Sequence, residues 1–436
     1  MSSGRAKARP DFLSSLLEVN NMHEIIKLEN GVRIICEQMP YVRSAAIGIF
    51  INFGSRNESP AENGSAHFIE HMLFKRTEKH SAAQLAFDMD AIGGQVNAFT
   101  TREATCFYAR VLDTHLNTAI DLLSEMFFEC AFDEAELESE RGVILEEIGM
   151  YEDTPDDVCY EKLMAGCYKG ALGRPVLGKP STLANMTGAG LKAYKEAHYT
   201  AGNIIVSLCG NYQESHLARI RDTFSAMPKS KTTKPRRADY SRVAVSKRKR
   251  TEQNQFCIAF PSCSSGSEER FAMNLLSTAL GGGVSSRLFQ NVREKHGLCY
   301  SIYSFQSGFQ DTGILAVATA VGKDTEAKAL GLIGDELKAL ADKGIMQDEL
   351  DRAREQVKSS LVMSLESTNA RMLKMGNSML IMGSCLTPDE LLERYDAVTR
   401  EDILSLAQKR FDFSQLSLSA IGKVGPAEEY IKALGL

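Results

Sequence analysis

The two halves of this 436-residue chain repeat one order of features, and this repetition limits the folds that the chain can adopt. Each half opens with a strand-like run, AAIGIFIN at 45–52 and QFCIAF at 255–260. Later in each half an Asp-Thr pair precedes a helix pattern, and an acidic helix start follows. These repeated elements are Asp113-Thr114 and Asp324-Thr325, then Glu136-Leu137 with Arg141 and Glu349-Leu350 with Arg354. The repetition predicts an α+β fold of two homologous domains, each an antiparallel sheet covered by helices.

A charged stretch with two prolines, MPKSKTTKPRRADYSRVAVSKRKR at 227–250, separates the two halves. Such a composition is typical of an exposed linker. We therefore predict an N-terminal domain at 1–226, a linker at 227–250 and a C-terminal domain at 251–436. An anionic partner for the basic linker is the alternative, and a solvated connector is the simpler interpretation.

Charge and cysteine usage exclude some classes of protein. The formal net charge of -6 gives no reason to expect nucleic acid as a partner. No apolar run approaches the roughly 18 residues of a membrane span. The ten cysteines form no C-x-x-C pair, which favours reduced thiols and a cytoplasmic location. The basic start, Met1–Pro10, lacks the apolar core of a secretory signal, so we expect a tail rather than a targeting segment.

The most informative motif is NGSAHFIEHMLFK at 63–75. Asn63 or Ser65 can cap a helix there. His67, Glu70 and His71 then share one face of the helix, so the two imidazoles can bind one ion with the carboxylate beside it. This spacing is the inverzincin signature. By itself the motif does not separate a metal site from a chance pair of histidines.

A second segment, DEAELESERGVILEEIGMYED at 133–153, predicts a long acidic helix. Glu140, Val143, Ile144 and Glu147 share one face of this helix. Apolar residues between the two glutamates indicate that the face is buried. A buried carboxylate is unfavourable unless it is paired or metal-bound, whereas a solvated acidic helix would need neither.

With these motifs the chain resembles the pitrilysin (M16) family of zinc peptidases, in particular bacterial relatives of the mitochondrial processing peptidase beta subunit. The resemblance implies one zinc ion per chain, held by His67, His71 and Glu147. It also implies that Glu70 is the general base for a zinc-activated water, and that Glu140 orients a ligand histidine. Two imidazoles and one carboxylate leave the open position that a catalytic zinc site requires. Manganese or cobalt are alternatives in vitro.

The resemblance also implies groups that hold the substrate. Asn97 and Ala98 match the family's substrate-binding strand, although an ordinary turn asparagine is the alternative. Arg293 and Tyr300 match an arginine–tyrosine pair in the C-terminal half, where donors could stabilise an oxyanion. A surface ion pair of Arg293 with Glu294, and a core position for Tyr300, are the alternatives.

The predicted function is therefore that of a zinc metalloendopeptidase. It would hydrolyse peptides or unfolded polypeptide segments inside a closed chamber, as a homodimer without nucleic acid. One alternative is a catalytically silent or peptide-binding structural subunit of the same fold. Another is a lyase resembling the S-ribosylhomocysteine enzymes, which are shorter and use a cysteine as third ligand. Cleavage specificity and pairing with a paralogue are not readable from the residues.

Overall fold

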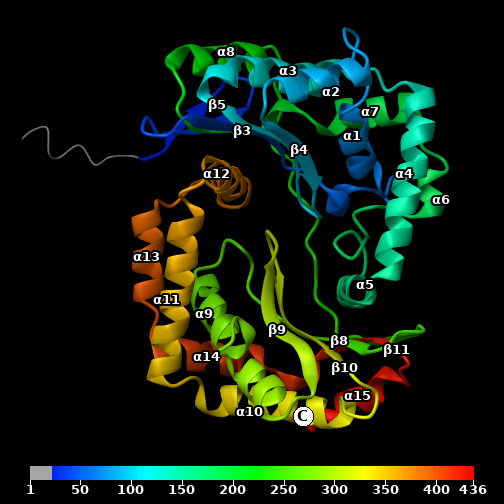
Figure 1. Ribbon diagram of the computed structural model, residues 1–436, viewed down its shortest axis with the longest axis vertical. Helices are drawn as coiled ribbons and strands as arrows, with labels where there is room; N and C mark the ends of the chain where they lie inside the picture. The colour runs from blue at the N-terminus through cyan, green and yellow to red at the C-terminus, as the bar shows by residue number, and fades with distance from the viewer. Residues whose placement is uncertain (1–21) are drawn as a thin grey trace, which may run out of the picture.

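Two β-sheets, one in each half of the chain, organise the structure (Figure 1). The computed structural model describes residues 22–436, so the prediction for Met1–Pro10 falls outside the described residues. The N-terminal sheet has six strands in the order β1 (Glu24–Lys27), β2 (Arg33–Gln38), β6 (Ile204–Gly210), β3 (Ser44–Ile51), β5 (Thr105–Leu112) and β4 (Gln95–Thr100). The C-terminal sheet has five, in the order β7 (Ala244–Arg248), β11 (Ser417–Gly422), β8 (Asn254–Pro261), β10 (Gly313–Val321) and β9 (Cys299–Gly308).

The predicted α+β fold is confirmed, with one difference in the sheets. Most strand pairs are antiparallel, but β2 pairs with β6 and β11 pairs with β7 in parallel. Parallel partners need a long crossover connection, and in both cases the paired strands are far apart in the sequence. The two sheets are therefore mixed, which local strand patterns do not reveal.

Helices of each half cover one face of their own sheet. The N-terminal helices are α1 (Ser65–Leu73), α2 (Ala82–Ala91), α3 (Leu116–Glu129), α4 (Glu134–Asp153), α5 (Pro155–Cys167), α6 (Pro180–Leu183), α7 (Gly188–His198) and α8 (Glu214–Ser225). The C-terminal helices are α9 (Glu269–Gly281), a π-helical segment (Phe289–Lys295), α10 (Glu326–Lys343), α11 (Gln347–Ser364), α12 (Thr368–Met382), α13 (Pro388–Asp396), α14 (Arg400–Arg410) and α15 (Ala427–Ala433). Alternate strand residues such as Ile47 and Ile49 face the N-terminal helices, and Ile258 faces the C-terminal ones.

The opposite face of each sheet is covered by a helix from the other half. Helix α12 packs on β3 and β6 of the N-terminal sheet through Met372, Met375 and Met379. In return α5 packs on β8 and β11 of the C-terminal sheet. Figure 1 shows α12 directly against the N-terminal sheet. We call this arrangement the helix exchange.

Both faces of the central strands are therefore buried. This explains why β3 reads as an almost continuous run of apolar residues. The approach of α12 is close, because a Cβ on Gly376 would lie 2.2 Å from the Phe50 ring.

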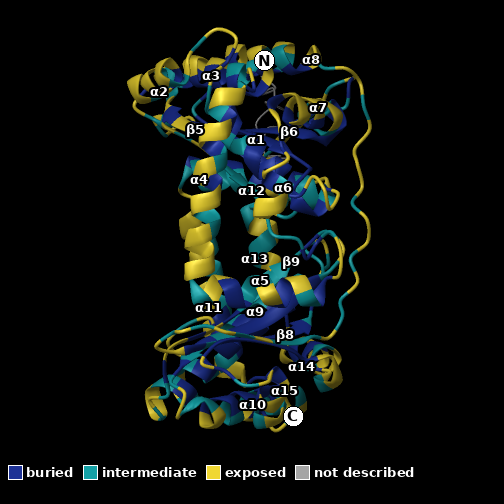
Figure 2. Ribbon diagram, turned by 90° about the vertical axis from the view of Figure 1, so that its right-hand side faces the viewer, coloured by how far each residue is buried: buried dark blue, intermediate teal, exposed yellow. Residues whose placement is uncertain are grey.

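The stretch predicted as a linker runs along the outside of the molecule from the end of α8 towards the C-terminal sheet (Figure 2). Its last part, residues 244–248, forms β7. The boundaries predicted at 226 and 251 divide the chain by sequence, whereas the helix exchange places parts of each half on the other. Within residues 22–436, no helix has the length and apolar character needed to cross a membrane.

Candidate metal centre

Helix α1, which carries the His-x-x-Glu-His motif, begins on a buried carboxylate. The prediction that Asn63 or Ser65 caps this helix is wrong, because the cap is Gly64, with a φ of 101° and no side chain to accept a hydrogen bond. Glu58, only 3% exposed, takes that role. Its carboxylate accepts from the N–H of Gly64 and of Ala66, both at 2.8 Å, and from the Asn63 amide at 2.9 Å. A negative charge there also interacts favourably with the helix dipole.

The structure brings His67, His71 and Glu147 together. The Nε2 atoms of the two histidines each lie 3.6 Å from Glu147 Oε2. One ligand atom from each residue lies within 4.8 Å of the others, the single such group of three within residues 22–436. Tetrahedral zinc with bonds of about 2.1 Å separates neighbouring ligand atoms by about 3.4 Å. The separations and the chemistry of the donors therefore fit a zinc ion.

Glu140 supports this group from about two turns before Glu147 on α4. Its Oε2 lies 3.0 Å from His71 Nδ1, and its Oε1 pairs with Lys75 at 2.7 Å. A carboxylate on Nδ1 leaves Nε2 as the metal-binding atom and fixes the ring orientation. Ile144 is buried as predicted, but Val143 is 48% exposed, so the buried face of α4 is narrower than predicted.

The three ligand groups differ in their protonation. Burial, with the nearby charge of His71, lowers the pKa of His67 to about 4. Burial also opposes the charged form of His71, but bonds with Glu147 and Glu140 outweigh it and raise the pKa of that ring. The bond with His71 lowers the pKa of Glu147. Glu147 and Glu140 therefore favour the protonated form of His71, and an entering ion would compete with that proton.

Glu70 lies on the same helix face and touches the edge strand β4. Its Oε2 accepts a hydrogen bond from Thr100 Oγ1 at 2.5 Å. Burial raises the pKa of Glu70, whereas the bond from Thr100 acts in the opposite direction. Thr100 was not singled out in the sequence, because a threonine that ends a strand carries no signal of its own.

Three of the other predicted site residues lie on edge strands, and Arg293 lies on the π-helical segment Phe289–Lys295. Asn97 and Ala98 lie on β4, and Asn97 Oδ1 accepts from the Ala98 N–H at 2.8 Å. Tyr300 lies on β9 and is 78% exposed, so the alternative of a core residue is wrong. The Arg293 guanidinium lies 5.0 Å from the centre of the Tyr300 ring and 3.8 Å from the Glu294 carboxylate.

The structure therefore forms two separate groups of predicted site residues. Arg293 and Tyr300 contact each other in the C-terminal half. Within residues 22–436, neither forms a hydrogen bond or ion pair with the residues around His67.

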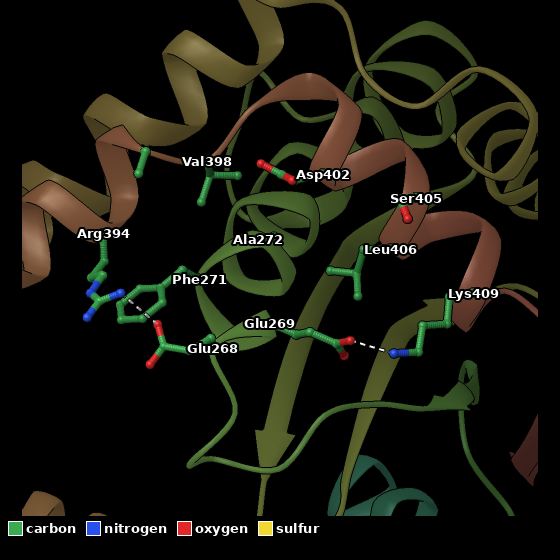
Figure 3. Close-up of a pocket in the computed structure, with 11 residues that line it drawn as sticks. Glu268, Glu269, Phe271, Ala272, Arg394, Val398, Asp402, Ser405, Leu406 and Lys409 are labelled. Atoms are coloured by element: carbon green, nitrogen blue, oxygen red, sulfur yellow. Dashed lines mark hydrogen bonds and ion pairs between the residues drawn. The ribbon is translucent and has the colours of Figure 1, made fainter.

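A pocket of about 390 Å³ in the C-terminal half, drawn in Figure 3, is not part of this centre. Four of its five charged residues are paired with each other: Lys409 with Glu269 at 2.5 Å and Arg394 with Glu268 at 3.3 Å. None of the predicted site residues lines it.

Two imidazoles and a carboxylate, with a further glutamate between the histidines on one helix, are the donor set of a zinc metallopeptidase. Comparison with known proteins agrees. Residues 33–180 match the family model of insulinase (peptidase family M16), and residues 185–357 match that of the peptidase M16 inactive domain. The chain belongs to peptidase family M16 and is a zinc peptidase of that family.

Relatives of similar length support this assignment. The chain is 41% identical over 400 residues to the uncharacterized zinc protease YmxG of Bacillus subtilis, which covers 91% of this chain and 98% of that protein. It is 41% identical over 408 residues to an uncharacterized zinc protease of Streptomyces coelicolor, covering 91% and 88%. A solved protease structure from Helicobacter pylori shares the fold with a TM-score of 0.86 at 20% identity, over 92% of this chain and 99% of that chain.

Proposed function

We propose that this zinc peptidase is an endopeptidase that hydrolyses peptides or unfolded polypeptide segments, with Glu70 as the general base. The observation that carries the proposal is the convergence of His67, His71 and Glu147, with Glu70 between the two histidines on α1. A silent subunit of the same fold would not need a carboxylate at that position.

The residues of the centre have separate roles in this proposal. His67, His71 and Glu147 would hold one zinc ion, which supplies Lewis acidity that polarises a peptide carbonyl and lowers the pKa of water. Glu70 Oε2 is held by Thr100, which leaves Oε1 to take a proton from water and deliver it to the leaving amine. Burial raises the pKa of Glu70, which makes its carboxylate a stronger proton acceptor and suits a general base.

The substrate would add as a strand to the free edge of β4, beside Asn97 and Ala98. In the order of the sheet β4 has β5 on one side only, so its other side can pair with an extended peptide. Thr100 at the end of the same strand contacts Glu70, which would bring the peptide bond near the base. Arg293 and Tyr300 would supply donors to the developing oxyanion after the two halves close on the substrate.

We further propose a homodimer whose domains enclose the substrate, in the cytoplasm. The cytoplasmic assignment is supported by the ten free cysteines, of which nine are buried. Sedimentation analysis tests the dimer. A monomer at all concentrations would contradict it.

The decisive experiment combines zinc analysis with peptide hydrolysis by the native chain, Glu70→Gln and Tyr300→Phe. We expect one zinc per chain in all three. Hydrolysis should be lost in Glu70→Gln and slowed in Tyr300→Phe. Equal turnover by native chain and Glu70→Gln would remove Glu70 from the role of base, and zinc loss in Tyr300→Phe would indicate a packing role.

A further inference from the structure

A buried arginine joins the two halves of the molecule on the side of the metal centre. Arg56 lies on a short 3₁₀ turn (Ser55–Asn57), and its side chain is 1% exposed. Its Nη1 pairs with Glu103, and its Nη2 donates to Asp311 Oδ2 at 2.6 Å and to the carbonyl of Arg236 at 2.7 Å. Glu103 belongs to the N-terminal half, Asp311 to the C-terminal half and Arg236 to the connector. We call Arg56, Glu103 and Asp311 the clasp.

Further hydrogen bonds close the same contact. Both oxygens of Glu103 accept from the Gln310 N–H, at 3.0 and 3.1 Å, and Asp311 Oδ2 accepts from the Ala238 N–H at 2.9 Å. The carboxylates of Glu103 and Asp311 therefore accept hydrogen bonds from donors in different parts of the chain. Removing one charge from such a buried group leaves the remaining charges poorly compensated.

The clasp connects the ends of the two exposed strand edges. Glu103 lies in the turn between β4 and β5, and Asp311 lies at the tip of the hairpin formed by β9 and β10. β4 and β9 are the outermost strands of their sheets. Thr100, which bonds to Glu70, ends β4 directly before the turn, whereas Tyr300 lies on β9 at the end away from the hairpin tip.

The backbone of the 3₁₀ turn is fitted to the β4–β5 turn as well. The N–H of Arg56 donates to the carbonyl of Arg102 at 2.8 Å. A Cβ on Gly54 would lie 2.4 Å from the carbonyl oxygen of Thr101, so only glycine permits this approach. A shift of Arg56 would therefore be transmitted to the turn that ends β4.

We propose that Arg56 is a positioning residue, which sets the spacing between the edge strands β4 and β9 and thereby aligns Glu70 with the groups on β9. This inference rests on the proposed function, because alignment matters only if both edges act on one substrate. The hairpin tip is also held by Tyr168, whose hydroxyl lies 3.2 Å from Thr312 Oγ1. Loss of the clasp should therefore loosen the hairpin without detaching it.

The test compares Arg56→Ala, Arg56→Lys and Asp311→Asn with the control Arg43→Ala. Arg43 forms an ion pair with Asp113 at 3.1 Å on an exposed part of the same half. We expect Arg56→Ala to keep its zinc and to lose about 10- to 100-fold in kcat/KM. The kcat/KM of Arg56→Lys should lie between those of Arg56→Ala and the native chain, because an ammonium cannot bind two carboxylates through separate nitrogens. The control Arg43→Ala should keep the zinc content and the kcat/KM of the native chain.

Amide hydrogen exchange supplies a readout that does not depend on peptidase activity. In Arg56→Ala and Asp311→Asn, protection should be lost at residues 309–312 and 101–104 and kept in the rest of both sheets. Asp311→Asn keeps the test valid if Arg56→Ala does not fold. Unchanged exchange in these segments would overturn the proposal, and so would zinc loss with exchange raised throughout the N-terminal sheet. If the native chain hydrolyses no peptide, the proposed function fails, whereas the exchange data still decide whether the clasp holds the two edges.

Discussion

Replacement of Glu58 by alanine should destabilise the metal-bearing helix more than any exposed substitution nearby. Three buried donors, the N–H groups of Gly64 and Ala66 and the Asn63 amide, would lose their acceptor. A buried donor without an acceptor costs about 1–3 kcal/mol. Even at the lower end, three donors give a loss of about 3 kcal/mol in the free energy of unfolding. The loss of a negative charge at the helix N-terminus acts in the same direction.

Thermal unfolding of the zinc-loaded chain measures this effect. For a cooperative unit of roughly 200 residues, a loss of 3 kcal/mol lowers the midpoint by about 6–12 °C. Glu62→Ala is the matched control, since Glu62 is exposed and, within residues 22–436, its carboxylate accepts only from the nearby Ser59 N–H, at 3.1 Å. The midpoint of Glu58→Gln should lie between those of Glu58→Ala and the native chain, because the amide keeps one acceptor oxygen but turns an NH₂ group towards the remaining donors. If Glu58→Ala melted within about 2 °C of the native chain, the capping role would be refuted.

Three further predictions concern the zinc site and the helix exchange. Glu140→Gln should weaken zinc binding by about 10- to 100-fold, measured by competition with a chelator, because the His71 ring loses its charged partner. Zinc affinity should fall as pH is lowered, beginning above pH 6.5, because Glu147 and Glu140 raise the pKa of His71 and the proton competes with the ion. Gly376→Ala should lower the free energy of unfolding by about 1–3 kcal/mol in denaturant titrations, because its Cβ overlaps the Phe50 ring.

Each of these predictions has a result that would contradict it, and the two substitutions also have control variants. Glu146 lies on the exposed face of α4, so Glu146→Gln should bind zinc as tightly as the native chain does. If Glu140→Gln also bound zinc as tightly as the native chain, Glu140 would not orient His71. Zinc affinity that did not vary between pH 8 and pH 6 would show that His71 binds no proton in the free chain. A Cβ on Gly142 would meet nothing within 4 Å, so Gly142→Ala should leave the free energy of unfolding unchanged or raise it. If both glycine substitutions lowered the free energy of unfolding equally, overlap with the Phe50 ring would not be the cause.

Helical spacing placed the two histidines and Glu70 on one helix face, because helical periodicity is local, and the resemblance to the M16 family implied that Glu147 is the third ligand. His67, Glu70 and His71 lie within about one turn of one helix, and Glu140 and Glu147 lie about two turns apart on one face of another. What could not be predicted depends on contacts between distant segments. Glu58 acts through a loop rather than at the cap position, and the pairing of Arg56 with Asp311 appears only when the two halves meet. The fold class followed from the strand and helix patterns in the same way. The parallel strand pairs and the helix exchange left no local signal.

The helix exchange also affects the order in which a new chain can complete its structure. The last strand of the N-terminal sheet ends at Gly210, whereas the helix that covers its second face begins at Thr368. At about 5–20 residues per second, the ribosome needs roughly 8–30 s to reach that helix. During this interval Phe50 and Ile205 have no covering partner, so the nascent N-terminal half exposes an apolar face to chaperones and to aggregation. Synthesis of the C-terminal half is therefore a step in the maturation of the metal-bearing half.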